Sequence, residues 1–355
     1  MMKRLIAIVC LATFPGLFSE SYAQSISHPS GELEQTTGDD IRPLNQKGST
    51  FNEAWVYHIY LDDGTQLYLS YMLANFGSFM SPVSGGRLSV IDFDGEYYNV
   101  AREYPLRELN FDDRKHKLRL HPERDIWFEG KLPESHRLRY KTSKDGVDYD
   151  IDLELSDIQP GKRWGDGKFK VDDHTISIQS LIPYAKVSGK VRINDTEKQV
   201  SGTVYMDHTY QSTITPRVLN SGYRFVHHNR KDDWQIGYYL IPEDKSETQN
   251  IVGYTLGQKD GGEVSLQKPT NLRLGSRVDF KGGRVPGQLN VDHNPDKSSK
   301  VTVSEGKERL SFLSELSGIR LRIARSYLRG EVMEYRGTGT LNEDKPVYLN
   351  FFRVE

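Results

Sequence analysis

The chain has 355 residues, with 47 basic and 49 acidic side chains and a formal net charge of −2. The two signs are interspersed without a basic stripe, which excludes a typical nucleic-acid-binding surface. The single cysteine, Cys10, lies within the first 23 residues, so a chain that begins at Gln24 would have no disulfide and no thiolate chemistry.

The first 23 residues have the pattern of a cleavable signal peptide. A basic start precedes an apolar run (Leu5–Phe18), and Ser21 and Ala23 provide the small residues that a signal peptidase requires. The apolar run is too short to cross a bilayer. We therefore predict cleavage after Ala23, a periplasmic or secreted location, and no transmembrane segment in the mature protein.

Residues 24–50 are rich in small and polar residues, and their lack of periodicity predicts a flexible lead-in. From Glu53 onward, short alternating runs of β-branched and aromatic residues are separated by turn signals such as Asp-Gly. The runs predict strands at 54–61, 66–76, 87–93, 96–101, 117–121, 126–132, 137–142, 148–155, 186–193 and 199–206. Pro183 predicts a bend or an edge rather than a central strand.

The second half of the chain repeats this pattern. Its runs predict strands at 222–228, 234–241, 251–258, 263–267, 273–280, 288–291, 300–303, 330–341 and 347–354. Only residues 310–327 could form a helix. Many short strands with almost no helix are typical of sandwiches or barrels, and residues 213–216 resemble a linker. We predict an all-β protein with two antiparallel barrel-like domains, at 51–215 and 216–355, packed side by side.

The densest group of reactive side chains ends the strand predicted at 199–206, where an Asp207-His208 pair is flanked by Tyr205 and Tyr210. Adjacent residues of a strand point to opposite faces, so at most one of the pair reaches a cavity directly unless a bulge intervenes. A buried Asp207 with a raised pKa could protonate an alkene, with His208 as the base or orienting group. A structural hydrogen-bond pair is the alternative.

Aromatic residues form two further groups. Trp55 and Tyr57 share one strand face, with Tyr71 on the return strand, and His227 lies near Trp234. Both groups are typical of a ligand-stacking wall, and also of a packed β-core. The sequence has no metal-ligand spacing, P-loop, dinucleotide fingerprint or nucleophile elbow. We predict no metal and no cofactor.

Three segments of the chain resemble a known family: the start Trp55-x-Tyr57, the Asp63-Gly64 turn and residues 200–210. It is the lipocalin-like family that contains carotenoid 1,2-hydratase (hydroxyneurosporene synthase) and the AttH-like proteins. The segment 200–210 is similar to that family's most recognisable pattern, G-x-x-Y/W-x-D-H-x-W/Y. Tyr210 stands where the hydratases usually have Trp.

The resemblance implies two calycin-type barrels with a ligand cavity at their junction. Activities of the family include hydration of a terminal isoprenoid double bond, terpenoid cyclisation, pericyclic cycloaddition and lipid binding without catalysis. Under the hydratase chemistry, Asp207 would protonate the alkene and water would trap the cation, while His208 and Tyr210 would shape the acid and the pocket.

The expected function is a secreted lipocalin-like protein that encloses a hydrophobic small molecule, an isoprenoid or a lipid, between its two barrels. An acid-catalysed hydratase or cyclase that uses Asp207 is the first alternative. A glycan-binding β-protein with exposed Trp and Tyr is a lesser one. The residues expected to bind the ligand are Trp55, Tyr57, Tyr71, Tyr205, Tyr210, His227 and Trp234.

Overall fold

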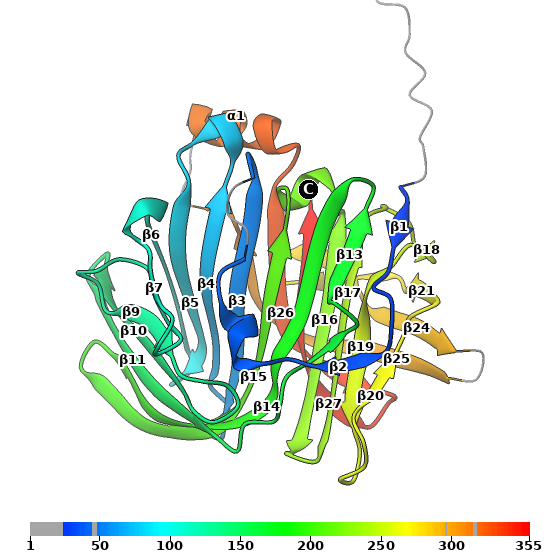
Figure 1. The fold of residues 1–355 in the computed structure, drawn as a ribbon, viewed down its shortest axis with the longest axis horizontal. Coiled ribbons are helices and arrows are strands. Elements are labelled where there is room, and N and C mark those ends of the chain that lie inside the picture. Colours follow the sequence, from blue (N-terminus) through cyan, green and yellow to red (C-terminus); the bar gives the residue numbers. More distant parts are fainter. Residues whose placement is uncertain (1–23, 45–47, 295–296, 315–317) are drawn as a thin grey trace, which may run out of the picture.

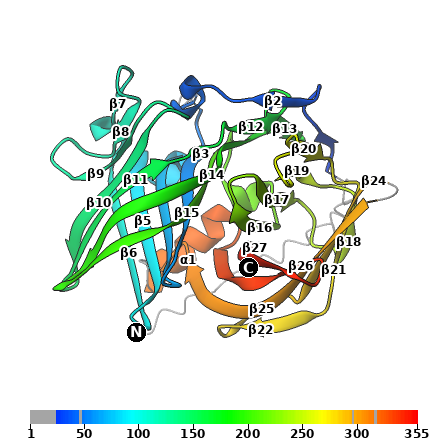
Figure 2. The ribbon, with the colours of Figure 1, turned by 90° about the horizontal axis from the view of Figure 1, so that it is seen from below.

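The computed structural model describes residues 24–44, 48–294, 297–314 and 318–355. Two strongly curved antiparallel sheets lie side by side, and a helix lies at one end of the molecule (Figures 1 and 2). The signal peptide predicted for residues 1–23 lies outside the described part of the chain. Within that part, no helix has both the length and the apolar character that crossing a membrane requires.

The first sheet has 15 strands, and its main path runs β6-β5-β4-β3-β15-β14-β11-β10-β9-β8-β7. Its strands are β1 (Ile26–Ser27), β2 (Leu33–Gln35), β3 (Phe51–Leu61), β4 (Gln66–Asn75), β5 (Val83–Phe93), β6 (Glu96–Pro105), β7 (Asn110–Asp112), β8 (Lys117–Arg119), β9 (Ile126–Glu129), β10 (His136–Lys144), β11 (Val147–Ser156), β12 (Lys162–Trp164), β13 (Lys168–Val171), β14 (His174–Ile193) and β15 (Thr196–Gln211). Short 3₁₀ helices are η1 (Gly38–Ile41), η2 (Gly77–Phe79), η3 (Leu106–Glu108) and η4 (Thr215–Arg217).

The second sheet has ten strands in the order β18-β21-β24-β25-β26-β27-β16-β17-β19-β20, and β22 pairs with β23 in a separate hairpin. The strands are β16 (Ser221–Arg230), β17 (Asp233–Ile241), β18 (Glu247–Thr248), β19 (Val252–Gln258), β20 (Ser265–Gln267), β21 (Asn271–Leu274), β22 (Arg277–Phe280), β23 (Gly283–Pro286), β24 (Gln288–Asn294), β25 (Lys297–Ser311), β26 (Val332–Leu341) and β27 (Lys345–Val354). The only α-helix in the described residues, α1 (Gly318–Leu328), lies between β25 and β26 in the chain.

Asp-Gly pairs form the tight turns of two hairpins, as their sequence indicates. Asp94 and Gly95 join β5 to β6 with φ angles of 54° and 82°, and Asp145 and Gly146 join β10 to β11 with 52° and 80°. Two successive residues with positive φ produce the turn whose twist matches that of the flanking strands. These turns fix the register that sorts side chains between the two faces of the sheet.

Each sheet curves around a core of its own. In β3, Trp55 and Tyr57 belong to the first core, together with Tyr71 of β4. The second core contains Tyr239 of β17 and Phe351 of β27 among its members. Because side chains alternate along a strand, the residues between them point out of each core.

The outward faces of the two sheets pack against each other and form a third, junction core. It combines Tyr60 and Tyr205 of the first sheet with Trp234 and Tyr238 of the second. The rings of Tyr60 and Tyr348 stack across the junction with centroids 3.5 Å apart. Strand β3 from Trp55 to Leu61 and strand β15 from Val204 to His208 are therefore buried on both faces.

The all-β prediction with two barrel-like units side by side is confirmed. The two sheets divide between Gln211 and Ser221, close to the predicted linker. Helix α1 falls largely within the predicted range of 310–327, although it begins at Gly318.

Two local expectations differ from the structure. Over residues 24–44 the predicted lead-in contributes β1 and β2, which pair with β13 and β12 over two or three residues each. Pairings of two or three residues are too short to produce a periodic pattern in the sequence. Pro183 lies inside β14, between β11 and β15 in the sheet, rather than at an edge. The register of β14 shifts on both sides of Ile182, and this irregularity accommodates the proline.

Candidate functional site at the junction of the two sheets

Strand β15 presents Asp207 and His208 to opposite sides of the first sheet. Asp207 shares its face with Tyr205, which lies in the junction core. His208 shares its face with Met206, which lies in the first core. The divergence predicted from strand geometry is confirmed, and it is Asp207 that faces the second sheet.

Asp207 forms an ion pair with Arg224 of β16. The Nη2 atom of Arg224 lies 2.9 Å from Oδ2 of Asp207, and the two side chains are 5% and 0% exposed. Nη1 of Arg224 lies 2.9 Å from Nε2 of His58 and donates to Oδ1 of Asn350 at 3.0 Å. The guanidinium also lies 4.0 Å from the ring centre of Tyr238, within cation–π distance. Arg224 therefore connects β15 and β3 of the first sheet with β17 and β27 of the second.

Several buried polar atoms around this pair lack an aligned hydrogen-bond partner among the described residues. They are both carboxylate oxygens of Asp207, Nε of Arg224, Nδ2 of Asn350 and Oγ of Ser180. Ser180 lies opposite Asp207 on the neighbouring strand β14. Most buried polar groups in folded proteins are hydrogen-bonded, so a group of unpaired ones requires an explanation. Arg224 and Tyr205 both lie within reach of the Asp207 carboxylate, so the unused hydrogen-bonding capacity of the junction rests mainly on Nε of Arg224, Nδ2 of Asn350 and Oγ of Ser180.

Burial dominates the titration of these groups. It raises the pKa of Asp207 above the ordinary value, and Arg224 offsets this in part. Burial lowers the pKa of His58 well below its ordinary value, and the positive charges of Arg224 and Arg336 lower it further. His58 is therefore neutral near pH 7 and can accept a hydrogen bond from Arg224. Because a guanidinium keeps its proton in proteins, Arg224 is a fixed cation beside a carboxyl group with a raised pKa.

A second charged cluster lies in the same junction. Arg336 of β26 pairs with Glu308 and Glu334, and all three side chains are at most 8% exposed. Its guanidinium carbon lies 3.5 Å from the ring centre of Tyr68. The Tyr68 ring in turn meets His58 edge-to-face, with centroids 5.1 Å apart. Tyr68 and His58 thus connect the two charged clusters.

The His208 face of β15 is a hydrogen-bonded structural arrangement, in which Oε2 of Glu53 is the buried oxygen without a partner within the described ranges. Nε2 of His208 lies 2.8 Å from Oε1 of Glu53, and Nδ1 lies 2.9 Å from the carbonyl oxygen of Asp40. The imidazole stacks on Trp55 with centroids 4.5 Å apart, and the indole donates to the carbonyl oxygen of Ile41 at 2.9 Å. Both ring nitrogens are engaged, so His208 fastens the segment around η1 to the first core.

Four of the aromatic residues predicted to bind ligand belong to the first core or pack against it: Trp55, Tyr57, Tyr71 and Tyr210. The hydroxyl of Tyr57 lies 2.8 Å from Nε2 of His136. The hydroxyl of Tyr71 donates to the carbonyl oxygen of Trp127 at 2.8 Å. The polar groups of Tyr57 and Tyr71 are thus hydrogen-bonded within the first unit.

The remaining predicted residues divide between two places. Trp234 lies in the junction core with Tyr205, and its indole donates to Oε1 of Gln258 at 3.2 Å. Nδ1 of His227 lies 2.7 Å from the carbonyl oxygen of Pro346. Of the predicted residues, the structure brings Asp207, Tyr205 and Trp234 to the junction.

The sequence prediction missed Arg224, Asn350 and the cluster around Arg336. A usable signal was present: Arg224 interrupts an apolar run formed by Tyr223, Phe225 and Val226. A charged residue within such a strand must be paired if both sheet faces are buried.

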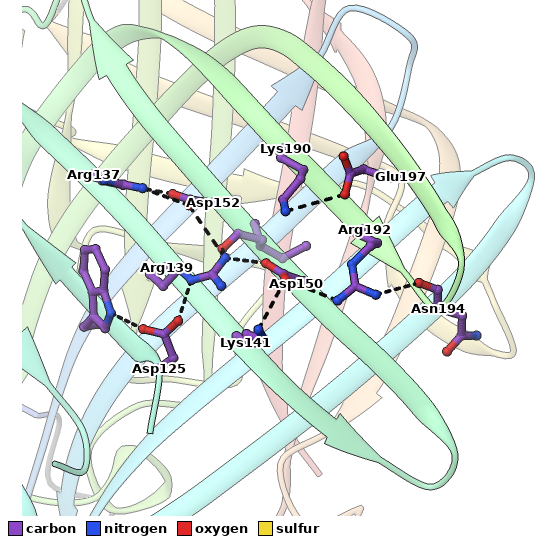
Figure 3. A network of polar contacts seen from close by, with 12 residues as sticks. Asp125, Arg137, Arg139, Lys141, Asp150, Asp152, Lys190, Arg192, Asn194 and Glu197 are labelled. Carbon is purple, nitrogen blue, oxygen red and sulfur yellow. Dashed lines mark hydrogen bonds and ion pairs between the residues drawn. The ribbon is translucent and has the colours of Figure 1, made fainter. Parts of the chain in front are cut away.

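Charged pairs on the outside of the first unit are of a different kind. Figure 3 shows a network across β10, β11 and β14. Arg137 and Asp152 lie 2.9 Å apart and are 42% and 26% exposed. Arg192 reaches Asp150 at 3.3 Å in the same network. The Arg137–Asp152 contact faces solvent, whereas Arg139 and Asp150 of the same network are 12% and 6% exposed.

Two cavities lie away from the Asp207–Arg224 pair. One, of about 100 Å³, is at the second unit beside Tyr223, Arg284 and Phe351. The other, of about 670 Å³, is an open groove beside Arg102, Tyr104 and Lys141 of the first unit. In the described part of the chain, no group of three or more His, Cys, Asp or Glu residues is placed to hold a metal ion.

No protein-family model and no curated protein sequence matches the chain. Solved structures do match. A protein assigned as AttH from Nitrosomonas europaea superposes with a TM-score of 0.61 and 14% identity, over 88% of this chain and 98% of that one. CghA with Sch210972 superposes with a TM-score of 0.54 and 12% identity, over 91% of this chain and 98% of that one. Kievitone hydratase from Nectria haematococca superposes with a TM-score of 0.50 and 11% identity, over 90% of this chain and 95% of that one.

At these identities the likeness establishes the fold and leaves the activity open. The carotenoid hydratase part of the resemblance therefore remains a prediction. The chain has the AttH-like, lipocalin-like fold, with two β-units that meet at the face of β15 carrying Asp207.

Proposed function

We propose that the protein binds a small, largely apolar molecule, an isoprenoid or a lipid, at the junction of its two β-units. The observation that carries this proposal is the buried Asp207–Arg224 pair with unfilled hydrogen-bonding capacity. Ser180 and Asn350 offer further unpaired polar atoms beside it, and the aromatic junction core is the adjacent apolar surface. Binding sites for small molecules combine such apolar walls with a few convergent polar groups.

The ligand's polar end, a hydroxyl or a carbonyl group, would meet Asp207, Ser180 and Asn350. Its apolar part would lie among Tyr205 and Tyr238, and these side chains must move for it to enter, because they pack closely in the junction core. The fold neighbours give support of a general kind, since one of them, CghA, was solved with Sch210972.

The binding proposal is tested by mass spectrometry of an organic extract of the purified protein. We expect an apolar molecule with one polar end, in an amount that approaches one per chain. An extract without such a molecule, from protein prepared out of its native source, would contradict the proposal.

Acid-catalysed hydration or cyclisation of an alkene is a second candidate, and one observation favours it. Burial raises the pKa of Asp207, as a carboxyl group that donates a proton requires. In this reaction the Asp207 proton adds to one alkene carbon, and water or a second double bond of the molecule attacks the cation at the other carbon. The added water, or the cyclised cation, then loses a proton to the carboxylate of Asp207. Between these two proton transfers, Arg224 would hold the carboxylate as an ion pair.

Turnover of terminal isoprenoid alkenes by the wild type and by Asp207→Asn tests the catalytic candidate. We expect the asparagine variant to lose at least a hundredfold in rate, the lower end of what general acid catalysis contributes. Equal rates would exclude Asp207 as the acid. The glycan-binding alternative gains no support, because all four tryptophans are at most 8% exposed and offer no indole platform for a sugar.

We also propose that the protein is exported, on the basis of the pattern in residues 1–23. Intact-mass measurement of the protein from its native source should give a chain that begins at Gln24. A mass that includes Met1 to Ala23 would contradict export by this signal.

A further inference from the structure

Helix α1 lies at one end of the molecule and is buried along one side only (Figure 1). Ala324 and Leu328 form a small apolar cluster with Ile214, just beyond the end of β15. Tyr327 packs against the same cluster. This side anchors the helix to the body of the protein and leaves the opposite side to solvent.

The solvent side of α1 carries isoleucines. Ile319 and Ile323 are 73% and 54% exposed, and they lie one helical turn apart on the same face. They are the two most exposed among six large hydrophobic side chains that the described residues leave open. A third, Phe312 at 41%, lies a few residues upstream at the end of β25. Scattered exposed apolar residues are ordinary, but this concentration on one short segment is not.

The same segment is strongly basic. Residues 318–329 contain four arginines and no acidic residue, in a chain whose net charge is −2. Arg325 is held by Glu331, with Nε and Oε2 2.6 Å apart. In the part of the chain that the structure describes, no carboxylate pairs with Arg322 or Arg329. We call Ile319, Arg322, Ile323 and Arg329 the α1 surface.

We propose that the α1 surface docks the protein on a membrane that is rich in anionic lipid. Ile319 and Ile323 would insert among the upper acyl chains, and Arg322 and Arg329 would lie at the level of the lipid phosphates. A helix with apolar and cationic residues on its free side binds in the plane of a membrane interface through both interactions. Each arginine near an anionic surface adds an attraction that salt screens.

Charge complementarity selects this partner. An acidic protein would satisfy the arginines but would not by itself bury two isoleucines, whereas an anionic bilayer satisfies both kinds of side chain. The helix has 11 residues and lies on the protein rather than through a bilayer. The inference goes beyond the proposed ligand site and does not depend on it, because none of its residues belongs to the junction.

Co-sedimentation of the full chain with vesicles tests the proposal. Vesicles of phosphatidylcholine with roughly one third phosphatidylglycerol should retain the protein, and pure phosphatidylcholine vesicles should not. The double variant Ile319→Ser/Ile323→Ser should reduce partitioning by about tenfold. Arg322→Gln/Arg329→Gln should reduce it by about tenfold at low salt and less at high salt.

A matched control removes two other exposed charges, Arg114→Gln/Arg284→Gln, and should leave vesicle binding unchanged. All variants should keep the thermal unfolding midpoint of the wild type, because none of the four α1-surface residues is buried. Equal binding to both vesicle types, equal loss in the helix and control variants, or no binding at all would overturn the proposal. Retention by soluble poly-glutamate that survives the isoleucine substitutions would assign the surface to an acidic macromolecule instead and would also overturn it.

Discussion

Arginine–aspartate contacts occur both on the outer face of the first sheet and between the two sheets, and their surroundings differ. Arg137 and Asp152 lie 2.9 Å apart on the surface, at 42% and 26% exposure (Figure 3). Arg224 and Asp207 lie at the same distance in the junction, at 5% and 0%. Water screens the first pair, whereas the second has lost its hydration and depends on its partner.

The difference separates charges that face solvent from charges that are buried between the sheets. A surface contact such as that of Arg137 and Asp152 is expected wherever strands face solvent. The buried pair lies among polar atoms whose desolvation is not offset by hydrogen bonds, and the proposed polar ligand group would supply partners for them. The first two predictions below concern buried groups, the third buried histidines, and the last the exposed network.

The largest effect is expected for Arg224→Ala. Removal of the guanidinium leaves the carboxyl group of Asp207 buried without its cation, which should lower the free energy of unfolding by about 3–5 kcal/mol. Urea unfolding followed by tyrosine and tryptophan fluorescence measures it. The double variant Asp207→Leu/Arg224→Met should recover most of the loss, since apolar residues of similar size can replace a buried pair. A loss below about 1 kcal/mol in Arg224→Ala would show that the pair is hydrated.

His208→Ala should be the next most costly substitution. It removes the stack on Trp55 and leaves the buried carboxylate of Glu53 with the backbone N–H of Leu44 as its remaining partner, so we expect a loss of about 2–4 kcal/mol in the free energy of unfolding. His208→Gln, which can still donate to Glu53, should lose less. If both variants retain wild-type stability while turnover disappears, His208 is catalytic and its structural assignment is wrong.

Acid should destabilise the protein through its buried histidines. Burial lowers the pKa of His136 to about 3 and that of His228 to about 3. A histidine whose pKa is lower in the folded chain stabilises that chain above its unfolded pKa. This contribution is lost as the pH falls from about 6.5 toward the folded value.

Each such histidine contributes up to about 1.4 kcal/mol per pH unit within this window. Denaturant unfolding at a series of pH values should therefore give a shallower slope for His136→Gln than for the wild type. Parallel slopes would contradict the neutral, buried state of His136.

The smallest effect is expected for Arg137→Ala in the exposed network. Surface ion pairs contribute about 0–1 kcal/mol, so the loss should be at most about 1 kcal/mol and should shrink in roughly half-molar salt. Urea midpoints at low and high salt measure this. A loss that equals that of Arg224→Ala would remove the distinction between the two regions.

The sequence was sufficient for the class of fold and for the orientation of one strand. Alternation and Asp-Gly turns predicted the hairpins, and the period of a strand predicted that Asp207 and His208 diverge. The sequence was insufficient to identify the residues that contact Asp207. Arg224 and Asn350 reach Asp207 only through the packing of one sheet on the other, and no local pattern encodes that contact.

The sequence also could not show which aromatic residues lie in the first core and which lie at the junction. Trp55 and Tyr57 share a face as predicted, but alternation cannot tell the inside of a barrel from its outside when both are buried. Tyr205 and Trp234 face the junction for the same period-two reason and were indistinguishable from them in the sequence. The lead-in over residues 24–44 pairs through runs too short to show a pattern.

The central claim is that the Asp207 face of β15 binds the ligand and that the His208 face does not. Its most direct test compares the apolar molecule retained per chain in Asp207→Asn and in Glu53→Gln, which neutralise buried carboxyl groups on opposite faces of the first sheet. Quantitative mass spectrometry of organic extracts should show loss of the molecule from Asp207→Asn and retention in Glu53→Gln. Retention in both variants would contradict the claim, and loss only from Glu53→Gln would contradict it and place the ligand inside the first core.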